Sequence, residues 1–391
     1  MNISRLTKYI ILMGRGTVYF TFAIMSIMTA CRGSEEISLE VDVSCAEVCR
    51  LEDLAAEVKV IPLEIRDTTV KVGDIYSLKS YGDRIFLYDG RFRKIQCFDG
   101  GRYYGELDRV GRGPEEYIDI GAYTYDALRD ELVIFERNAR QLKFYSCSSF
   151  RMSRSIQMDF YISALEHISG DKFLVVRENS SSDSGDGAVL ILDIVTGYKV
   201  DWFPISTVQS DLISDMSITR ERDGSVLFSL PGYVNEVYRA DATGFTEVSG
   251  IFFGKYGARR KFWEEESTDG EYIRDMLEGG GPAAIAPSYY MEDGDRESFW
   301  YVSRYGTDMY HQPLMSLFIR DGEAYRAVSR LVIDGVADDL QPLCASEGYY
   351  YSIVYPQQVS AVREGMSPLC REIAAVSEAA GDNPLIITFR I

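Results

Sequence analysis

The side chains that most often carry enzyme chemistry are few, or lie outside a recognisable motif, in this sequence of 391 residues. The two histidines, His167 and His311, lie outside any Gly-x-Ser-x-Gly context that would present a nucleophilic serine. Acidic residues are abundant, but no motif selects the facing carboxylate pair that glycoside hydrolysis needs. No Asp-x-Asp-x-Asp-Gly loop is present for calcium. We therefore expect no catalytic residue, no metal site and no cofactor.

The segment 110–117, Val-Gly-Arg-Gly-Pro-Glu-Glu-Tyr, is the most distinctive polar motif. It lacks the Lys-Ser/Thr pair that completes a phosphate-binding loop, and its glycines suit a tight connection between strands. Two interpretations stay open: the loop contacts a ligand, or Glu115 or Tyr117 pins it by hydrogen bonds. Tyr289 and Tyr290 offer stacking faces, although strand alternation should bury about half of such a run. The candidate ligand-binding residues are Arg109, Arg112, Glu115, Glu116, Tyr117, Tyr289 and Tyr290.

The cysteines favour neither zinc nor catalysis, because the sequence has no Cys-x-x-Cys pair and almost no histidine near them. In an exported protein they could be oxidised. We expect Cys97 and Cys147 to be small buried thiols, and Cys344 with Cys370 to be the disulfide.

The elements that must position these residues are short strands. Segment 81–107 predicts a three-stranded meander, because its apolar runs are bounded by Gly and Asp turns. Its opening run, 82–88, recurs roughly every 40 to 50 residues except across one insertion, which is typical of propeller blades. The further copies are 129–135, 170–176, 223–228, 296–301 and 347–351.

A lone meander cannot bury both faces, so we expect an all-β fold, a six-bladed β-propeller with short peripheral helices. The strand that begins each blade should line a central channel, and the 110–117 loop should lie near its mouth. The expected inner strands are 72–79, 120–125, 162–168, 217–220, 285–291 and 340–345.

The early run 58–63 has no meander of its own, so we expect it to close the ring as the outer strand of the last blade. Segments 259–278 and 364–380 predict helices that end at glycine. They either pack outside the ring or form a mobile lid.

The N-terminal sequence predicts a targeting signal rather than part of the folded domain. Basic residues precede an apolar run, 18–28, that is too short to span a bilayer comfortably. The following Met-Thr-Ala-Cys resembles a bacterial lipobox, which implies lipidation of Cys31. The alternatives are an ordinary signal peptide cleaved near Ala30, or a signal anchor. We expect residues 1–31 to be a lipoprotein signal peptide, 32–51 a tether and 52–391 the propeller.

Three local patterns carry a family resemblance. They are segment 110–117, the strand Ile-Pro-Leu-Glu at 61–64, and the ending Asp-Asn-Pro-Leu-Ile-Ile at 382–387. Together with the lipobox they resemble six-bladed β-propeller lipoproteins of unknown function, with NHL-like blades, from gut-type Gram-negative bacteria. The resemblance implies an outer-membrane lipoprotein, facing the periplasm or the surface, and it implies no reaction.

The formal net charge of −19 argues against nucleic acid as a partner, because an acidic body repels phosphates. We expect a non-enzymatic envelope protein, held at the membrane by its lipid, that binds a glycan, peptide or protein partner at the channel mouth. One alternative is a propeller hydrolase or lactonase that uses acidic channel residues and a metal. Another is a structural subunit of an outer-membrane assembly. Three converging carboxylates would favour the enzyme, whereas a mouth of Tyr and Arg would favour the binding protein.

Overall fold

The computed structural model describes residues 39–40, 42–65, 71–178, 187–204, 217–229, 236–257, 283–304, 314–359 and 366–391. The chain divides into two compact units, Met1–Leu39 and Glu40–Ile391. Nearly all described residues belong to the second unit, which is built mainly from strands. Cys31, the expected helix at 259–278, and His311 lie outside the described residues.

The strands of Glu40–Ile391 form six antiparallel sets of four among the described residues, and further pairings join or extend three of these sets. The first three sets are β4 (Ile75–Tyr81), β5 (Arg84–Asp89), β6 (Lys94–Asp99) and β7 (Arg102–Leu107); β8 (Ile120–Asp126), β9 (Glu131–Glu136), β10 (Gln141–Ser146) and β11 (Met152–Gln157); and β12 (Tyr161–Ser169), β13 (Lys172–Glu178), β14 (Gly187–Asp193) and β15 (Lys199–Pro204). The other three are β16 (Ile218–Arg220), β17 (Val226–Phe228), β18 (Glu236–Ala240) and β19 (Phe245–Phe252); β20 (Ala283–Asp293), β21 (Arg296–Arg304), β22 (Leu314–Asp321) and β23 (Ala324–Val332); and β24 (Cys344–Ser346), β25 (Tyr349–Val354), β26 (Leu385–Arg390) and β3 (Glu57–Pro62).

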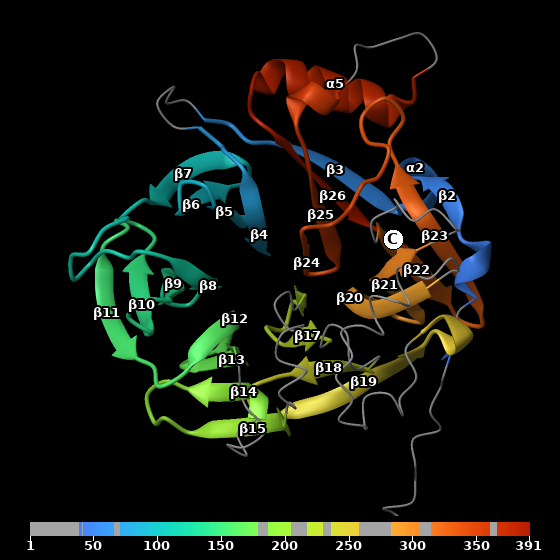
Figure 1. The fold of residues 1–391 in the computed structure, drawn as a ribbon. Coiled ribbons are helices and arrows are strands. Elements are labelled where there is room, and N and C mark those ends of the chain that lie inside the picture. Colours follow the sequence, from blue (N-terminus) through green and yellow to red (C-terminus); the bar gives the residue numbers. More distant parts are fainter. Residues whose placement is uncertain are drawn as a thin grey trace, which may run out of the picture. The chain divides into compact units, whose positions relative to one another are not determined.

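The hydrophobic cores lie between neighbouring sets, so each set buries its apolar faces against the next. One cluster joins Phe86 of the first set to Tyr125 of the second. The next joins Phe135 of the second set to Phe173 of the third. The middle strands are therefore buried on both faces, as in β9, whose six residues are all buried. Figure 1 shows the sets side by side around a common centre, so the fold is an all-β propeller, as the recurrent meander predicts.

The ring is closed by a strand from near the start of the described chain. β3 pairs antiparallel with β26 along its whole length, from Leu385 opposite Pro62 to Arg390 opposite Glu57. Leu63, which follows β3, is fully buried in a cluster with Leu78 of the first set and Ile386 of the last. The prediction that segment 58–63 supplies the outer strand of the last blade is confirmed.

Two pairings depart from a regular ring. β16 pairs in parallel with β24, with Thr219 opposite Ala345, so the innermost strands of the fourth and sixth sets join into one sheet. The other departure is β2 (Glu47–Arg50), which pairs in parallel with β23 and extends the fifth set. β2 lies within the interval expected to be a tether, so packed structure begins before residue 52.

Helices are few and short. α5 (Pro368–Ala380) is capped by the Ser367 side chain, which accepts a hydrogen bond from the Cys370 amide, and it ends at Gly381 with φ of 67°. Ile373 of α5 packs with Leu385 and Phe389 of β26, and Figure 1 shows the helix outside the last set. The remaining short elements are β1 (Leu39–Glu40), α2 (Leu51–Leu54) and the 3₁₀ turns Val43–Cys45, Gly254–Tyr256 and Pro356–Gln358.

The expected disulfide between Cys344 and Cys370 is wrong, since both are free, buried thiols. Cys344 lines a cavity at the centre of the ring, whereas Cys370 lies on α5 outside the last set and its Sγ is 2.8 Å from the Asp334 carbonyl oxygen. None of the described helices is both long and apolar enough to cross a membrane.

Candidate functional site

A cavity of about 800 Å³ lies where the innermost strands meet. Its lining includes residues from the first strand of every set, as the predicted inner strands require. Because the side chain of Tyr76, which lines it, is 72% exposed, the cavity is reached from solvent. Representative lining residues from the six strands are Lys79, Tyr123, Glu166, Arg220, Tyr289 and Cys344.

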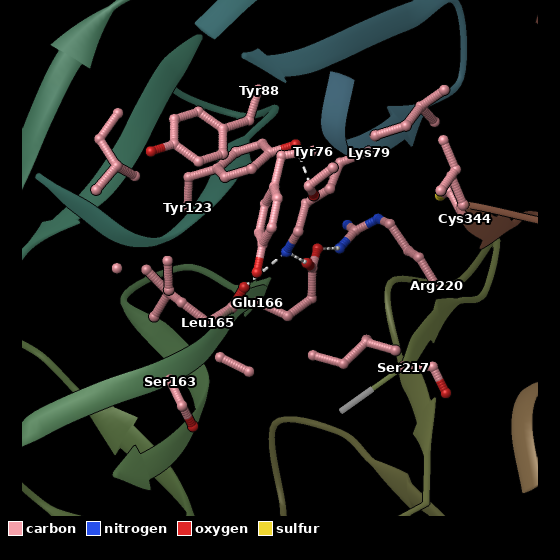
Figure 2. A pocket seen from close by; sticks show the side chains of 18 of the residues that line it. Tyr76, Lys79, Tyr88, Tyr123, Ser163, Leu165, Glu166, Ser217, Arg220 and Cys344 are labelled. Atoms are coloured by element: carbon pink, nitrogen blue, oxygen red, sulfur yellow. Dashed lines mark hydrogen bonds and ion pairs between the residues drawn. The ribbon is translucent and has the colours of Figure 1, made fainter. Parts of the chain in front are cut away.

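Three charged side chains from different sets meet in this cavity (Figure 2). Lys79 Nζ lies 2.7 Å from Glu166 Oε2, and Arg220 Nη1 lies 3.4 Å from Glu166 Oε1. Both cations also donate to main-chain carbonyls, Lys79 to Leu165 at 2.8 Å and Arg220 to His167 at 2.7 Å. Glu166 is only 3% exposed, so one buried carboxylate is shared by two cations. The group carries one net positive charge.

Hydroxyl groups extend this network. The Tyr81 phenol donates to Glu166 Oε2 at 3.2 Å and lies 3.0 Å from the Thr124 hydroxyl, which accepts from the His167 amide at 2.9 Å. Burial, and next the Glu166 carboxylate, raise the pKa of Tyr81 well above its ordinary value. The phenol therefore stays protonated and can donate at every physiological pH.

Tyrosines from the first two sets form an aromatic wall beside the charges. Tyr76 packs edge-on against Tyr88 at 6.1 Å, and Tyr88 lies 6.1 Å from Tyr123 between ring centroids. The Tyr123 hydroxyl is 3.2 Å from Ser77 Oγ, and the Lys79 ammonium lies 5.4 Å from its ring centroid. Figure 2 shows Tyr88 and Tyr123 on one side of the pocket, with Ser163 and Ser217 on the other side in that view. Ring faces and hydroxyls thus share one cavity.

A second charged group lies at the ends of β9 and β13. Arg137 forms an ion pair with Glu178, and both line the cavity. Arg177, 6% exposed, also lines it and stacks its guanidinium over Phe160 at 4.7 Å. The described lining therefore holds four cationic side chains against two carboxylates.

The candidate loop at 110–117 lies apart from this cavity, and none of its residues lines it. Tyr117 is fully buried and donates to the Leu107 carbonyl at 2.9 Å, while the Gly113 amide donates to Glu116 Oε2 at 2.7 Å. Arg109 Nε donates to the Phe150 carbonyl at 2.6 Å and pairs with Glu115 at 3.7 Å. The structure thus places these residues in contacts that hold the loop.

Gly111 and Gly113 leave room for that arrangement, because a Cβ on Gly111 would overlap the Glu116 carboxylate. Arg109 and Glu116 instead border a separate hollow of about 500 Å³, which is not lined by the inner strands. Arg112, the remaining candidate of the loop, borders neither cavity.

The two candidate tyrosines of β20 lie in different environments. Tyr289 lines the central cavity, whereas Tyr290 is 3% exposed and stacks on Phe299 at 6.3 Å within the fifth set. His167 does not line the cavity; its Nε2 lies 3.0 Å from the Gly170 carbonyl oxygen, as expected for a structural histidine.

Lys79, Glu166 and Arg220 were not selected from the sequence, although each lies within a predicted inner strand. The available signal was the presence of charged side chains within three strands expected to be buried, because a buried charge needs a partner. No set of three or more His, Cys, Asp or Glu side chains in the described part of the chain could hold a metal ion.

Comparison with known families identifies one that covers most of the chain. A family model for a domain of unknown function, DUF4934, matches residues 34–390. The chain belongs to the DUF4934 family. No curated protein matches this member of the family in sequence.

Several solved structures resemble this DUF4934 protein at low sequence identity. A candidate exported protein of Bacteroides fragilis has a TM-score of 0.63 at 13% identity, covering 89% of this chain and 99% of the other. A member of the DUF4221 family from Bacteroides vulgatus has a TM-score of 0.48 at 10% identity, covering 86% and 96%. BamB from Moraxella catarrhalis has a TM-score of 0.39 at 12% identity, covering 77% and 87%. At 13% identity, the likeness to the Bacteroides fragilis protein concerns the fold alone.

Proposed function

We propose that this chain is a non-enzymatic, lipid-anchored binding protein of the cell envelope, with a six-bladed propeller that takes its ligand into the central cavity. The observation that carries this proposal is the solvent-reached cavity of about 800 Å³, lined from all six inner strands. Its volume lies within the range of roughly 300–1,000 Å³ typical of sites for small molecules and short segments of larger partners.

The lining supports binding rather than hydrolysis. Of the two carboxylates that line the described cavity, Glu166 is held by Lys79 and Arg220, and Glu178 is paired with Arg137. A metal-using hydrolase would be supported by three converging carboxylates with oxygen atoms open to a cation. The tyrosine wall and the arginines instead match the pattern expected of a binding protein.

The binding test compares two matched tryptophan variants of the full-length protein, purified in detergent. Ser163→Trp places an indole in the cavity, whereas Ser149→Trp places the same ring in the separate hollow beside Phe150. On an array of oligosaccharides and peptides, we expect Ser163→Trp to weaken binding at least about tenfold and Ser149→Trp to leave it unchanged. Equal binding by both variants, or no binding of any probe by the wild type, would contradict the proposal.

The envelope location rests on the N-terminal sequence and on the similar candidate exported protein of Bacteroides fragilis. Metabolic labelling with an alkyne fatty acid in a Gram-negative host tests the anchor. We expect Cys31→Ala to lose both the label and the membrane fraction, while Cys45→Ala, the matched control, keeps both. Label that persists in Cys31→Ala would exclude lipidation at this residue.

A further inference from the structure

We propose that the central cavity binds an acidic saccharide, a sugar chain that bears a carboxylate. This inference rests on the proposed binding function and specifies its ligand class. It follows from three properties of the cavity: its charge, its hydroxyl groups and its exposed ring face.

The charge of the cavity is opposite to that of the protein. The chain carries a formal net charge of −19, yet in the cavity Lys79 and Arg220 share the single carboxylate of Glu166, which leaves this group with one net positive charge. A cavity with low-dielectric walls concentrates such a field. An anion is therefore the ligand that this local charge favours.

Lys79 is the best placed of these cations to receive the anion. Its ammonium has three N–H groups, and two are used by the Leu165 carbonyl and the Glu166 carboxylate. The lysine side chain lines the cavity and remains 22% exposed, and neither of these two bonds uses its third N–H. A ligand carboxylate there would form a charge-assisted hydrogen bond.

The hydroxyl groups favour a sugar over a peptide. Ser163 Oγ donates to the Val176 carbonyl at 3.4 Å and keeps its acceptor sites, whereas Ser217 Oγ accepts from the Tyr289 amide at 3.1 Å and keeps its donor. Ser77 shares a hydrogen bond with Tyr123 in either direction. Half-buried hydroxyls that can both donate and accept match sugar hydroxyls, which also do both.

The ring of Tyr76 supplies the apolar contact. It is 72% exposed at the cavity and is held edge-on by Tyr88. A sugar ring presents C–H groups on its faces, and an aromatic face buries them. Tyr76 and Lys79 both line the cavity, so a saccharide of several rings could stack one ring on the tyrosine and bring a carboxylate to the lysine.

The experiment measures binding of three probes to the full-length protein by calorimetry: a galacturonate trimer, its methyl ester, and a glutamate-rich hexapeptide. The ester keeps the rings and loses the charges. We expect the trimer to bind at least about tenfold more tightly than the ester, with an affinity that falls as salt increases.

Two matched lysine variants then test whether Lys79 is the cation that binds the ligand carboxylate. Lys79→Gln breaks the pair with Glu166 at 2.7 Å, and Lys94→Gln breaks a pair with Glu106 at 2.9 Å that lies outside the cavity. We expect Lys79→Gln to weaken trimer binding about tenfold and to abolish the preference over the ester, whereas Lys94→Gln changes neither. Tyr76→Ala removes an exposed ring without disturbing the fold, and should weaken both saccharides about fivefold.

Equal affinity for the trimer and its ester would overturn the proposal that the ligand is an acidic saccharide. Binding of the hexapeptide without binding of the trimer would overturn it as well. Either result would leave the cavity as a binding site, provided that Ser163→Trp still blocks whichever probe binds. Loss of the Ser163→Trp effect would instead overturn the proposed function itself.

Discussion

Lys79 and Glu166 form an ion pair of 2.7 Å between the first and third strand sets, although they are 87 residues apart in the chain. With Arg220 of the fourth set, this pair ties three inner strands together at the centre of the propeller. The same side chains line the candidate ligand cavity. The junction between the strand sets and the proposed binding site therefore share one group of charges.

Glu166→Gln should destabilise the protein, because it leaves Lys79 and Arg220 without their shared carboxylate in a nearly buried position. We expect the free energy of unfolding to fall by about 3 kcal/mol in urea titrations. Glu115→Gln is the control, since Glu115 pairs with Arg109 at 3.7 Å and is half exposed; its effect should stay within about 0.5 kcal/mol. Equal effects of the two substitutions would show that the central ion pair stabilises the protein no more than the exposed pair does.

Leu63→Ala tests closure of the ring. Leu63 is fully buried between the first and last sets, so truncation removes contacts on both sides of the closure. We expect a loss of about 2–5 kcal/mol in the free energy of unfolding. Leu128→Ala, at a position that is 80% exposed, should change it by less than about 0.5 kcal/mol. A stable Leu63→Ala variant would argue that the ring does not depend on this junction.

Gly111→Ala tests the loop that follows the first set. The added methyl group would overlap the Glu116 carboxylate, so that side chain must move and its bond to the Gly113 amide is lost. We expect the free energy of unfolding, measured by thermal denaturation, to fall by about 0.5–1.5 kcal/mol, the typical net contribution of one hydrogen bond. In the double variant with Glu116→Ala, the two effects should be less than additive. Ligand binding in the central cavity should not change, because the loop does not line it.

Cys97 should make the protein less stable in alkali. Burial raises the pKa of its thiol from 9.0 to about 11, so the folded state disfavours the thiolate that the unfolded chain forms more easily. The resulting stability is fully present below pH 9 and is lost as the pH rises toward 11. In urea titrations, the free energy of unfolding of the wild type should fall between pH 8 and 11, and in Cys97→Ala this fall should be smaller by about 1–2 kcal/mol.

Val133→Ala is the control for the cysteine. Val133 is also fully buried but does not titrate, so its truncation should lower stability equally at every pH. A Cys97→Ala curve parallel to that of the wild type would contradict the assignment.

The sequence alone determined the repeating unit and its closure. Apolar runs bounded by Gly and Asp predict the meanders, and a lone strand before the first meander predicts the pairing of β3 with β26. These features are local, because turn chemistry and alternation act over a few neighbouring residues. The same reasoning located the inner strands, and it placed Tyr289 at the cavity that they line.

Only the tertiary structure decided which side chains meet. Lys79, Glu166 and Arg220 come together because β4, β12 and β16 converge on one centre, and the pairing of β16 with β24 has no signal in either strand. The tertiary structure also keeps the Cys344 and Cys370 thiols free, and it directs Glu116 and Tyr117 to main-chain groups of the connection after the first set. The order of residues along a strand determines which of its side chains share a face. The orientation of each strand set about the central axis depends instead on packing between neighbouring sets. That packing determines which residues face the cavity.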